Sequence, residues 1–275
     1  GEMHGLIRVR QFTISEGHLI VRPDQLEQEF KGCLELATYC LKCVGLDDDV
    51  SYRFSKWDPN NREKYIYDPE KWDKAQNEME RILNDLNVKY TVGIDEAAFY
   101  GPKLDIQIKN VYGKEDTLVT IQIDMFLAEN FDMSYVDENG NKVRPYIIHR
   151  TSIGCYERTM ALILEKFGGA LPTWLAPTQV KVLSLTERTE DDARALTAEL
   201  KSKGVRAVED VRNEKIGYKI REAQLEKVPY MIIIGDKEKE NGVVSVRNRK
   251  SGDMGTMTKE EFIALINKEV EEKTL

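Results

Sequence analysis

The sequence has 275 residues, of which 41% are hydrophobic and 32% charged, a composition typical of a folded globular protein rather than a disordered one. No apolar run approaches the ~18 residues of a membrane-spanning helix, the N-terminus has no secretion signal, and the four cysteines have no disulfide-framework spacing. We therefore expect a cytoplasmic protein without a membrane partner. The net charge is −8, but residues 177–275 carry 19 basic and 19 acidic residues, so this second part is neutral and can present a local basic face to nucleic acid.

The first part of the chain predicts an α+β domain. Its hydrophobic periodicity predicts, in order, strands at 6–12 and 18–22, a helix from Pro23 to Gly45, a strand at 50–55 and a helix from Pro69 to about Leu86. Strands at 104–109, 118–125 and 146–149 follow, with a turn at 137–141 and then a helix at 152–167. Because tight turns join consecutive strands, we expect an antiparallel sheet.

The second part has a different pattern. Residues 171–178 contain two prolines and predict a linker between a domain at 1–170 and one at 179–275. Strands and helices then alternate, at 180–185, 189–203, 205–208, 214–226 and 230–235, before a last helix that Thr258 caps. This order predicts an α/β domain with a mostly parallel sheet and helices on both faces.

Polar side chains on the predicted inner strands of the first part call for a ligand or a partner, because burying them unpaired costs several kcal/mol. Converging arginines such as Arg8 and Arg158 suit a polyphosphate, and Phe12 follows Arg8 on the same strand face, where it could stack on a base. The alternative is a set of exposed strand ends that pair with the abundant acidic residues.

The sequence has three histidines, and His18 and His149 lie beside predicted strands. Two histidines from different strands could bind Zn²⁺, but zinc sites use at least three protein ligands, and no third ligand has a recognisable spacing here. Satisfied core histidines are the alternative interpretation.

In the second part, residues 212–221 place several hydrogen-bonding groups at one end of the predicted sheet. Lys215, Lys219 and Lys227 recur at helical intervals and predict a basic ridge, which suits the edges of unpaired RNA bases. Asn213 could simply cap the helix, and a solvated charged face is the alternative to an RNA site.

Several stretches taken together resemble threonyl-tRNA synthetases, a family of class II aminoacyl-tRNA synthetases, over nearly the whole chain. The stretches are MHGLIRVRQFT at 3–13, AFYGPK at 98–103, IQID at 121–124, IIHRTSIGCYER at 147–158, PTWLAP at 172–177, RNEKIGYKIRE at 212–222, VPYM at 228–231 and GDKE at 235–238. The resemblance implies a class II catalytic sheet followed by an anticodon-binding domain. It also implies ATP-dependent activation of L-threonine, with Mg²⁺, and transfer of the threonyl group to the 3′ end of tRNA-Thr.

The resemblance also implies roles for residues of the first part. Arg8 and Arg158 correspond to the motif 2 and motif 3 arginines, and would be catalytic residues that bind the ATP phosphates. The other ATP-pocket residues would be Phe12, stacked on adenine, with Lys103, Thr120 and Gln122. Threonine would contact Glu16, Tyr100 and Gln122. His18 and His149 match two zinc ligands, and zinc in this family binds the threonine amino group and hydroxyl, which rejects valine.

In the second part, the residues that fall at anticodon contacts of the family are Asn213, Arg221, Lys227, Glu238 and Arg247. Lys227 stands where an arginine is more familiar.

The chain also departs from the family pattern. It begins inside motif 2, so motif 1, which builds the family's homodimer interface, the first motif 2 strand and the cysteine of the zinc site are not among its residues. Ile14, Ser15, Glu16 and Gly17 replace a more familiar Gln-Asp-Asp-Ala, and Thr117 replaces a common glutamine. We therefore expect this chain alone to activate threonine weakly or not at all.

Two other interpretations stay open from the sequence. One is a truncated relative that binds tRNA without catalysis, and the other is a class II enzyme for a different amino acid. The synthetase interpretation requires one further arrangement, in which a single cavity is lined by Arg8, Phe12, Gln122, His149 and Arg158.

Overall fold

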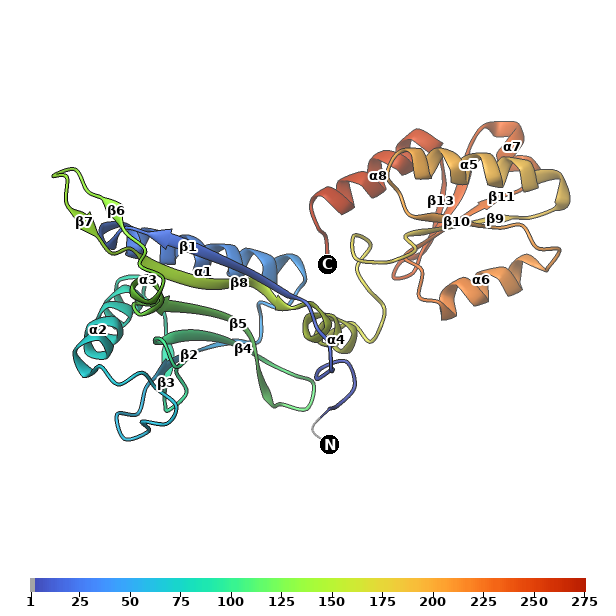
Figure 1. Ribbon diagram of the computed structural model, residues 1–275. Coiled ribbons are helices and arrows are strands. Elements are labelled where there is room, and N and C mark those ends of the chain that lie inside the picture. Colours follow the sequence, from blue (N-terminus) through green and yellow to red (C-terminus); the bar gives the residue numbers. More distant parts are fainter. Residues whose placement is uncertain (1–2) are drawn as a thin grey trace. The chain divides into compact units, whose positions relative to one another are not determined.

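The computed structural model describes residues 3–275, and the chain divides into two compact units, Gly1–Glu165 and Lys166–Leu275 (Figure 1). Each unit has its own sheet and its own hydrophobic core. Among the described residues, no helix combines the length and apolar composition that crossing a membrane requires.

The first unit is built on a six-stranded sheet with the order β1-β8-β5-β4-β2-β3. Its strands are β1 (Ile14–Val21), β2 (Val50–Lys56), β3 (Tyr90–Ile94), β4 (Lys103–Lys109), β5 (Glu115–Asp124) and β8 (Tyr146–Cys155). All neighbouring pairs are antiparallel except β2 and β3, as the tight turns predict. The predicted turn near residue 139 joins the short strands β6 (Tyr135–Val136) and β7 (Lys142–Val143), which form a separate hairpin.

Two helices, α1 (Leu26–Cys43) and α2 (Pro69–Asp85), pack on one face of this sheet. A short 3₁₀ helix (Pro23–Gln25) leads into α1, and the side chain of Asp68 caps α2 by accepting from the backbone N–H of Lys71. The core between helices and sheet includes Leu26, Phe30, Met79, Ile82, Leu83, Leu104, Ile121, Ile123 and Ile148. Because side chains alternate along a strand, the residues between these apolar ones face the opposite side of the sheet.

One predicted element of this unit is absent and another starts later than predicted. The strand predicted at 6–12 is absent from the described residues, where an isolated bridge joins His4 to Arg8 and β1 starts only at Ile14. The helix predicted from Ser152 starts at Tyr156 instead, as α4 (Tyr156–Lys166), because pairing with Ile14 keeps β8 extended as far as Cys155. A short helix, α3 (Leu127–Asn130), follows β5.

The second unit contains a five-stranded sheet with the order β10-β9-β11-β12-β13. Its strands are β9 (Val180–Ser184), β10 (Ala207–Asp210), β11 (Tyr230–Ile234), β12 (Val244–Asn248) and β13 (Gly252–Met257). The first three are parallel, as the alternating pattern predicts, but β12 and β13 pair antiparallel. The sheet is therefore mixed rather than mostly parallel, because the short connections after β11 cannot make a parallel crossover.

Helices cover both faces of this second sheet. In Figure 1, α5 (Glu190–Ser202) and α8 (Lys259–Glu271) lie on one face and α6 (Ile216–Leu225) on the other. The 3₁₀ helix η2 (Glu187–Thr189) leads into α5, and α7 (Asp236–Asn241) follows β11. This arrangement buries both faces of the parallel strands.

Lys219 does not belong to the predicted basic ridge, because it lies on the buried side of α6, which faces the sheet. Its Nζ donates to the carbonyl oxygen of Ser184 at 2.9 Å, to the Ser184 hydroxyl at 3.2 Å and to the carbonyl oxygen of Asp210 at 3.2 Å. Burial lowers the pKa of Lys219. The ammonium group thus joins the carboxyl ends of β9 and β10.

Candidate active site

The face of the first sheet that lies opposite α1 and α2 carries a row of polar residues across four strands. The register pairs His18 of β1 with His149 of β8. It continues from His149 to Gln122 of β5, and from Gln122 to Lys103 of β4. Residues opposite one another on neighbouring strands lie close, so strand pairing brings together four side chains from distant parts of the sequence.

A second polar row lies two residues further along the same strands. Glu16 pairs with Thr151 of β8. Thr120 of β5 pairs with Asp105 of β4, and its backbone N–H donates to Oγ1 of Thr151 at 3.0 Å. The two rows form one polar surface, because a period of two keeps both on the same face of the sheet.

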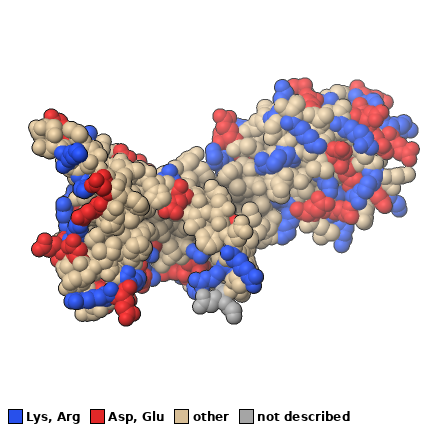
Figure 2. Space-filling view, in the orientation of Figure 1, with Lys and Arg blue, Asp and Glu red and all other residues tan. Residues whose placement is uncertain are grey.

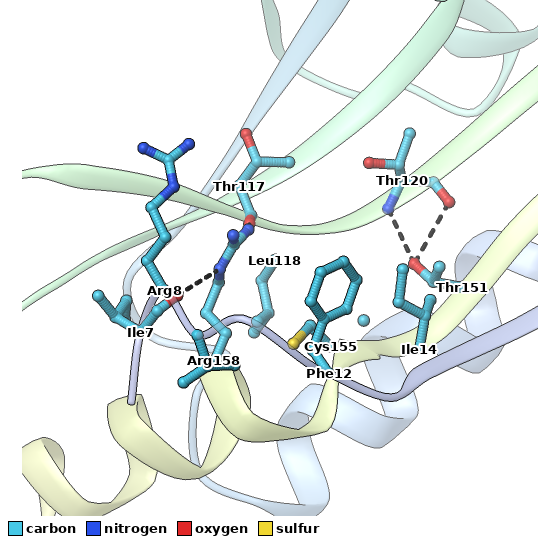
Figure 3. A pocket seen from close by; sticks show the side chains of 12 residues that line it. Ile7, Arg8, Phe12, Ile14, Thr117, Leu118, Thr120, Thr151, Cys155 and Arg158 are labelled. Atoms are coloured by element: carbon cyan, nitrogen blue, oxygen red, sulfur yellow. Dashed lines mark hydrogen bonds between the residues drawn. The ribbon is translucent and has the colours of Figure 1, made fainter. Parts of the chain in front are cut away.

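A cavity of about 430 Å³ adjoins the second row (Figure 3). It is lined by Ile7, Arg8, Val9, Phe12, Ile14, Thr117, Leu118, Thr120, Thr151, Gly154, Cys155 and Arg158. Thr120 and Thr151 belong to both the cavity and the second row. The cavity has two cationic side chains, an aromatic ring and hydroxyl groups, which is the chemistry that a nucleotide requires.

Arg158, in the first turn of α4, holds the N-terminal segment against the sheet. Its Nη1 donates to the carbonyl oxygen of Thr117 at 2.7 Å, and its Nε donates to the carbonyl oxygen of Ile7 at 3.4 Å. Figure 3 shows Arg8, the next residue along from Ile7, close to Arg158 at one end of the cavity and Phe12 nearer Thr151. The two guanidinium groups and the ring are therefore placed at different parts of one cavity.

Three potential metal ligands meet in the two rows. Glu16, His18 and His149 each offer a ligand atom, and these atoms lie within 4.8 Å of one another. The closest approaches to Glu16 Oε1 are 3.4 Å from His18 Nε2 and 3.9 Å from His149 Nδ1. Two imidazoles and a carboxylate are ligands that Zn²⁺ accepts, so this donor set fits the metal.

Tyr100 lies over the first row. Its hydroxyl donates to Oε1 of Gln122, and its ring centroid lies 4.9 Å from that of His149. Burial, with the nearby charges of Asp124 and Glu16, raises the pKa of Tyr100 to about 12. The phenol therefore stays protonated at neutral pH, and the bond leaves the amide NH₂ of Gln122 as the donor that a ligand can meet.

The structure divides the five side chains expected in a single cavity. Arg8, Phe12 and Arg158 line the cavity described above, whereas Gln122 and His149 do not. The latter two lie in the neighbouring first row on the same face of the sheet. The expectation of one cavity is therefore wrong in its strict form, because the second row separates the two groups.

The anticodon candidates of the second unit do not form one cluster. Asn213 donates to Oε1 of Glu187 at 3.2 Å, and it follows the carboxyl end of β10. Lys227 precedes the start of β11, at the opposite end of the parallel strands, and its Nζ donates to the carbonyl oxygen of Gly168. Arg221 lies between them, exposed on α6.

The remaining two candidates have partners within the second unit. Glu238 accepts from the Ser245 hydroxyl at 2.9 Å and from the backbone N–H of Gly235 at 3.0 Å, while Arg247 contacts Asp253 at 3.3 Å. Figure 2 shows acidic and basic side chains interspersed over the visible face of this unit. An RNA site here would be an extended surface that exchanges these partners for bases, rather than a single basic patch.

Sequence reasoning missed Asp105 and gave Asp124 no role. Both carboxylates are buried in the sheet, Asp105 against Thr120 and Asp124 against His149. The strict alternation of residues 104–109 could have placed Asp105 on the face of Lys103, but the strand that it pairs with cannot be read from alternation alone.

Comparison with known proteins agrees with this architecture. The family model "tRNA synthetase class II core domain (G, H, P, S and T)" matches residues 1–167, and the model "Anticodon binding domain" matches residues 179–269. A threonine–tRNA ligase of Clostridium botulinum (strain Eklund 17B / Type B) is 60% identical over 99% of this chain, and one of Staphylococcus aureus (strain JH9) is 47% identical over 96%. The chain spans 42% and 41% of the lengths of these two relatives.

A solved structure also resembles the chain. The crystal structure of the RNA binding domain of threonyl-tRNA synthetase from Cryptosporidium parvum Iowa II superposes with a TM-score of 0.89 and 31% identity, and the match covers 96% of this chain and 66% of that one. The chain therefore belongs to the threonyl-tRNA synthetase family, with a class II synthetase core followed by an anticodon-binding domain.

Proposed function

We propose that this protein takes part in the ligation of L-threonine to tRNA-Thr, and that its first unit binds ATP and threonyl-adenylate. The observation that carries the proposal is the cavity that Arg8, Arg158 and Phe12 line beside the polar rows of the sheet. In this reaction a threonine carboxylate oxygen attacks the α-phosphorus of ATP and pyrophosphate leaves. The 3′-terminal hydroxyl of the tRNA then attacks the threonyl carbonyl carbon and AMP leaves.

The nucleotide end of the site would work by positioning and by charge. Arg8 and Arg158 would bind phosphate oxygens and stabilise the charge that develops on them, assisted by the Mg²⁺ that accompanies ATP. Phe12, a residue that is 53% exposed, would stack on adenine. Lys103, Thr120 and Gln122 would line the path from the phosphates to the amino acid.

The amino-acid end would lie over the first row, between Tyr100, Gln122 and Glu16. Zn²⁺ bound by His18 and His149 would supply a Lewis acid that accepts the amino group and hydroxyl of threonine but not the methyl group of valine. The Glu16 carboxylate lies at the same point, where it can ligate the metal or accept a hydrogen bond from the substrate. The NH₂ group of Gln122 would donate to the substrate, while its oxygen accepts from Tyr100.

The second unit would bind the anticodon loop through Asn213, Arg221, Lys227, Glu238 and Arg247. We propose residues 1–170 as the catalytic part, 171–178 as the linker and 179–275 as the anticodon-binding part. Participation in translation implies a cytoplasmic location, and pairing into a homodimer is the arrangement expected of the family. The interpretation as a tRNA-binding module without catalysis is not favoured, because the relatives that cover the chain are named ligases.

Isothermal titration of the purified chain with non-hydrolysable threonyl-, seryl- and valyl-adenylate analogues tests the proposal. We expect the threonyl analogue to bind most tightly when Zn²⁺ is present, and Arg158→Gln to weaken it by about tenfold or more. Arg144→Gln, at an exposed arginine of the first unit, is the control. No binding by the wild-type chain, or a preference for the valyl analogue, would contradict the proposed function.

A further inference from the structure

Asp105 is a buried carboxylate at the junction of the two polar rows, and it has a partner on each side. Its exposed fraction is only 2%. Oδ1 accepts from the Thr120 hydroxyl at 2.9 Å, while Oδ2 lies 2.8 Å from Lys103 Nζ and accepts from the Ser55 hydroxyl at 2.8 Å. Three side chains therefore hold the two oxygens of Asp105.

A buried anion of this kind is stable only where opposite charge and donors compensate for its lost hydration. Lys103 provides the charge and is itself only 22% exposed. The Lys103 ammonium is therefore held at one point beside Gln122 rather than moving through solvent, and less rotamer freedom remains for a ligand to remove.

The bond to Thr120 has a second consequence, which concerns the direction of hydrogen bonding. A hydroxyl has one proton, and the Thr120 proton is directed to Asp105. Thr120 also lines the cavity, and a ligand there can use the hydroxyl oxygen only as an acceptor. The neighbouring Gln122 amide has its NH₂ group available as a donor, while its oxygen already accepts from Tyr100.

We propose that Asp105 is a positioning residue for the adenylate site. It holds the Lys103 ammonium in place and makes the Thr120 hydroxyl an acceptor, so that the first row and the adjoining cavity wall match a ligand that offers an anionic group beside Lys103 and a donor beside Thr120. The proposal rests on the proposed function, since the ligand is the adenylate that the cavity would bind.

The substitution Asp105→Asn tests the proposal, because asparagine has the same size but lacks the charge and puts an NH₂ group where one carboxylate oxygen stood. We expect the affinity for the threonyl-adenylate analogue to fall by about tenfold or more. Ser55→Ala removes the third partner, leaves both positioned groups in place and should change the affinity by less than about threefold. Equal affinity in Asp105→Asn and wild type would overturn the proposal.

Coupling between residues distinguishes a positioning role of Asp105 from a general loss of stability in the Asp105→Asn variant. If Asp105 acts through Thr120 and Lys103, the double variant Thr120→Val/Lys103→Met should lose the same affinity as Asp105→Asn, and adding Asp105→Asn to it should cost little more. This double variant retains Asp105, so it also tests the proposal if Asp105→Asn does not fold. Strictly additive losses would contradict positioning, and so would a double variant that binds like wild type.

The reactivity of the Lys103 amine, measured without nucleotide, tests the role of Asp105 independently of adenylate binding. Brief acetylation followed by peptide mass spectrometry measures how reactive each lysine amine is. Asp105→Asn should raise the acetylation rate of Lys103 several-fold, while Lys109, an exposed residue of the same strand, should react as in wild type. An unchanged Lys103 rate overturns the positioning role, whereas failure of the wild-type chain to bind the analogue contradicts the proposed function alone.

Discussion

The Nε2 atom of His149 lies 2.9 Å from Oδ2 of Asp124, a carboxylate with no exposed surface. The other oxygen of Asp124 accepts the backbone N–H groups of Phe126 and Leu127 at 2.8 and 2.9 Å, so the carboxylate cannot turn away. With Nε2 directed to Asp124, the lone pair on Nδ1 is free to face Glu16 and His18. A carboxylate behind a histidine in this way fixes the tautomer and strengthens the histidine as a metal ligand.

Asp124→Asn should weaken Zn²⁺ binding by about 10- to 100-fold, because an amide holds the His149 ring less firmly than a carboxylate does. Competition with a chromogenic zinc chelator measures this affinity. Asp116→Asn changes another carboxylate of β5, whose partner is Asn110, and should leave the affinity unchanged. Equal zinc affinity in Asp124→Asn and wild type would show that the carboxylate does not support the ligand.

Phe12→Ala should weaken binding of the adenylate analogue by about 5- to 150-fold, which corresponds to the ~1–3 kcal/mol of a base stacked on an aromatic ring. The melting temperature should barely change, because 53% of the Phe12 side chain is already exposed. Phe131→Ala, with 71% exposure, is the matched control in calorimetric titrations. A Phe12 variant that binds as tightly as this control would contradict stacking.

Gly101→Ala and Gly32→Ala should change stability in opposite directions. A Cβ at Gly101 would lie 2.0 Å from the backbone oxygen of Ile123, which cannot move aside, so a loss of about 3 kcal/mol is expected. A Cβ at Gly32, in the exposed middle of α1, meets no atom within 4 Å, and alanine favours the helix by about 1 kcal/mol. Urea unfolding measures both values, and destabilisation of similar size in both variants would contradict this difference.

Asp210→Asn should lower the stability of the second unit at neutral pH but not in strong acid. Hydrogen bonds from Arg212, together with its charge, hold the pKa of Asp210 below its ordinary value. The unfolded chain therefore binds a proton more readily than the folded one. The stabilisation is complete above the ordinary aspartate pKa of about 3.9 and is lost as the pH falls through the lower folded-state pKa.

The expected difference from wild type at pH 7 is about 1–2 kcal/mol, because Asp210 is buried but Arg212 is half exposed. Urea titrations between pH 2 and pH 7 measure it. Asp253→Asn removes an exposed partner of Arg247 and should cost less than about 0.5 kcal/mol. A difference for Asp210→Asn that grows toward low pH would have the wrong sign.

Local patterns were sufficient to predict most elements of both units. The spacing of apolar residues located α1 and α2, and the alternation in residues 104–109 located β4, because these periods reflect which side of an element is buried. The parallel order of β9, β10 and β11 followed from strands separated by helices. The resemblance to synthetases named Arg8, Phe12 and Arg158, and the structure places these three around one cavity.

What the sequence determined by itself was therefore the order and type of most elements, together with the residue types able to bind a nucleotide. The absence of a strand at residues 6–12, the burial of Lys219, the meeting of Glu16 with His18 and His149, and the positions of Asp105 and Asp124 emerged only from the folded arrangement. The physical reason is that periodicity reports the side of an element that is buried but not its neighbour. Register and contact arise when strands far apart in the sequence pair, and a carboxylate has no recognisable partner until that pairing exists.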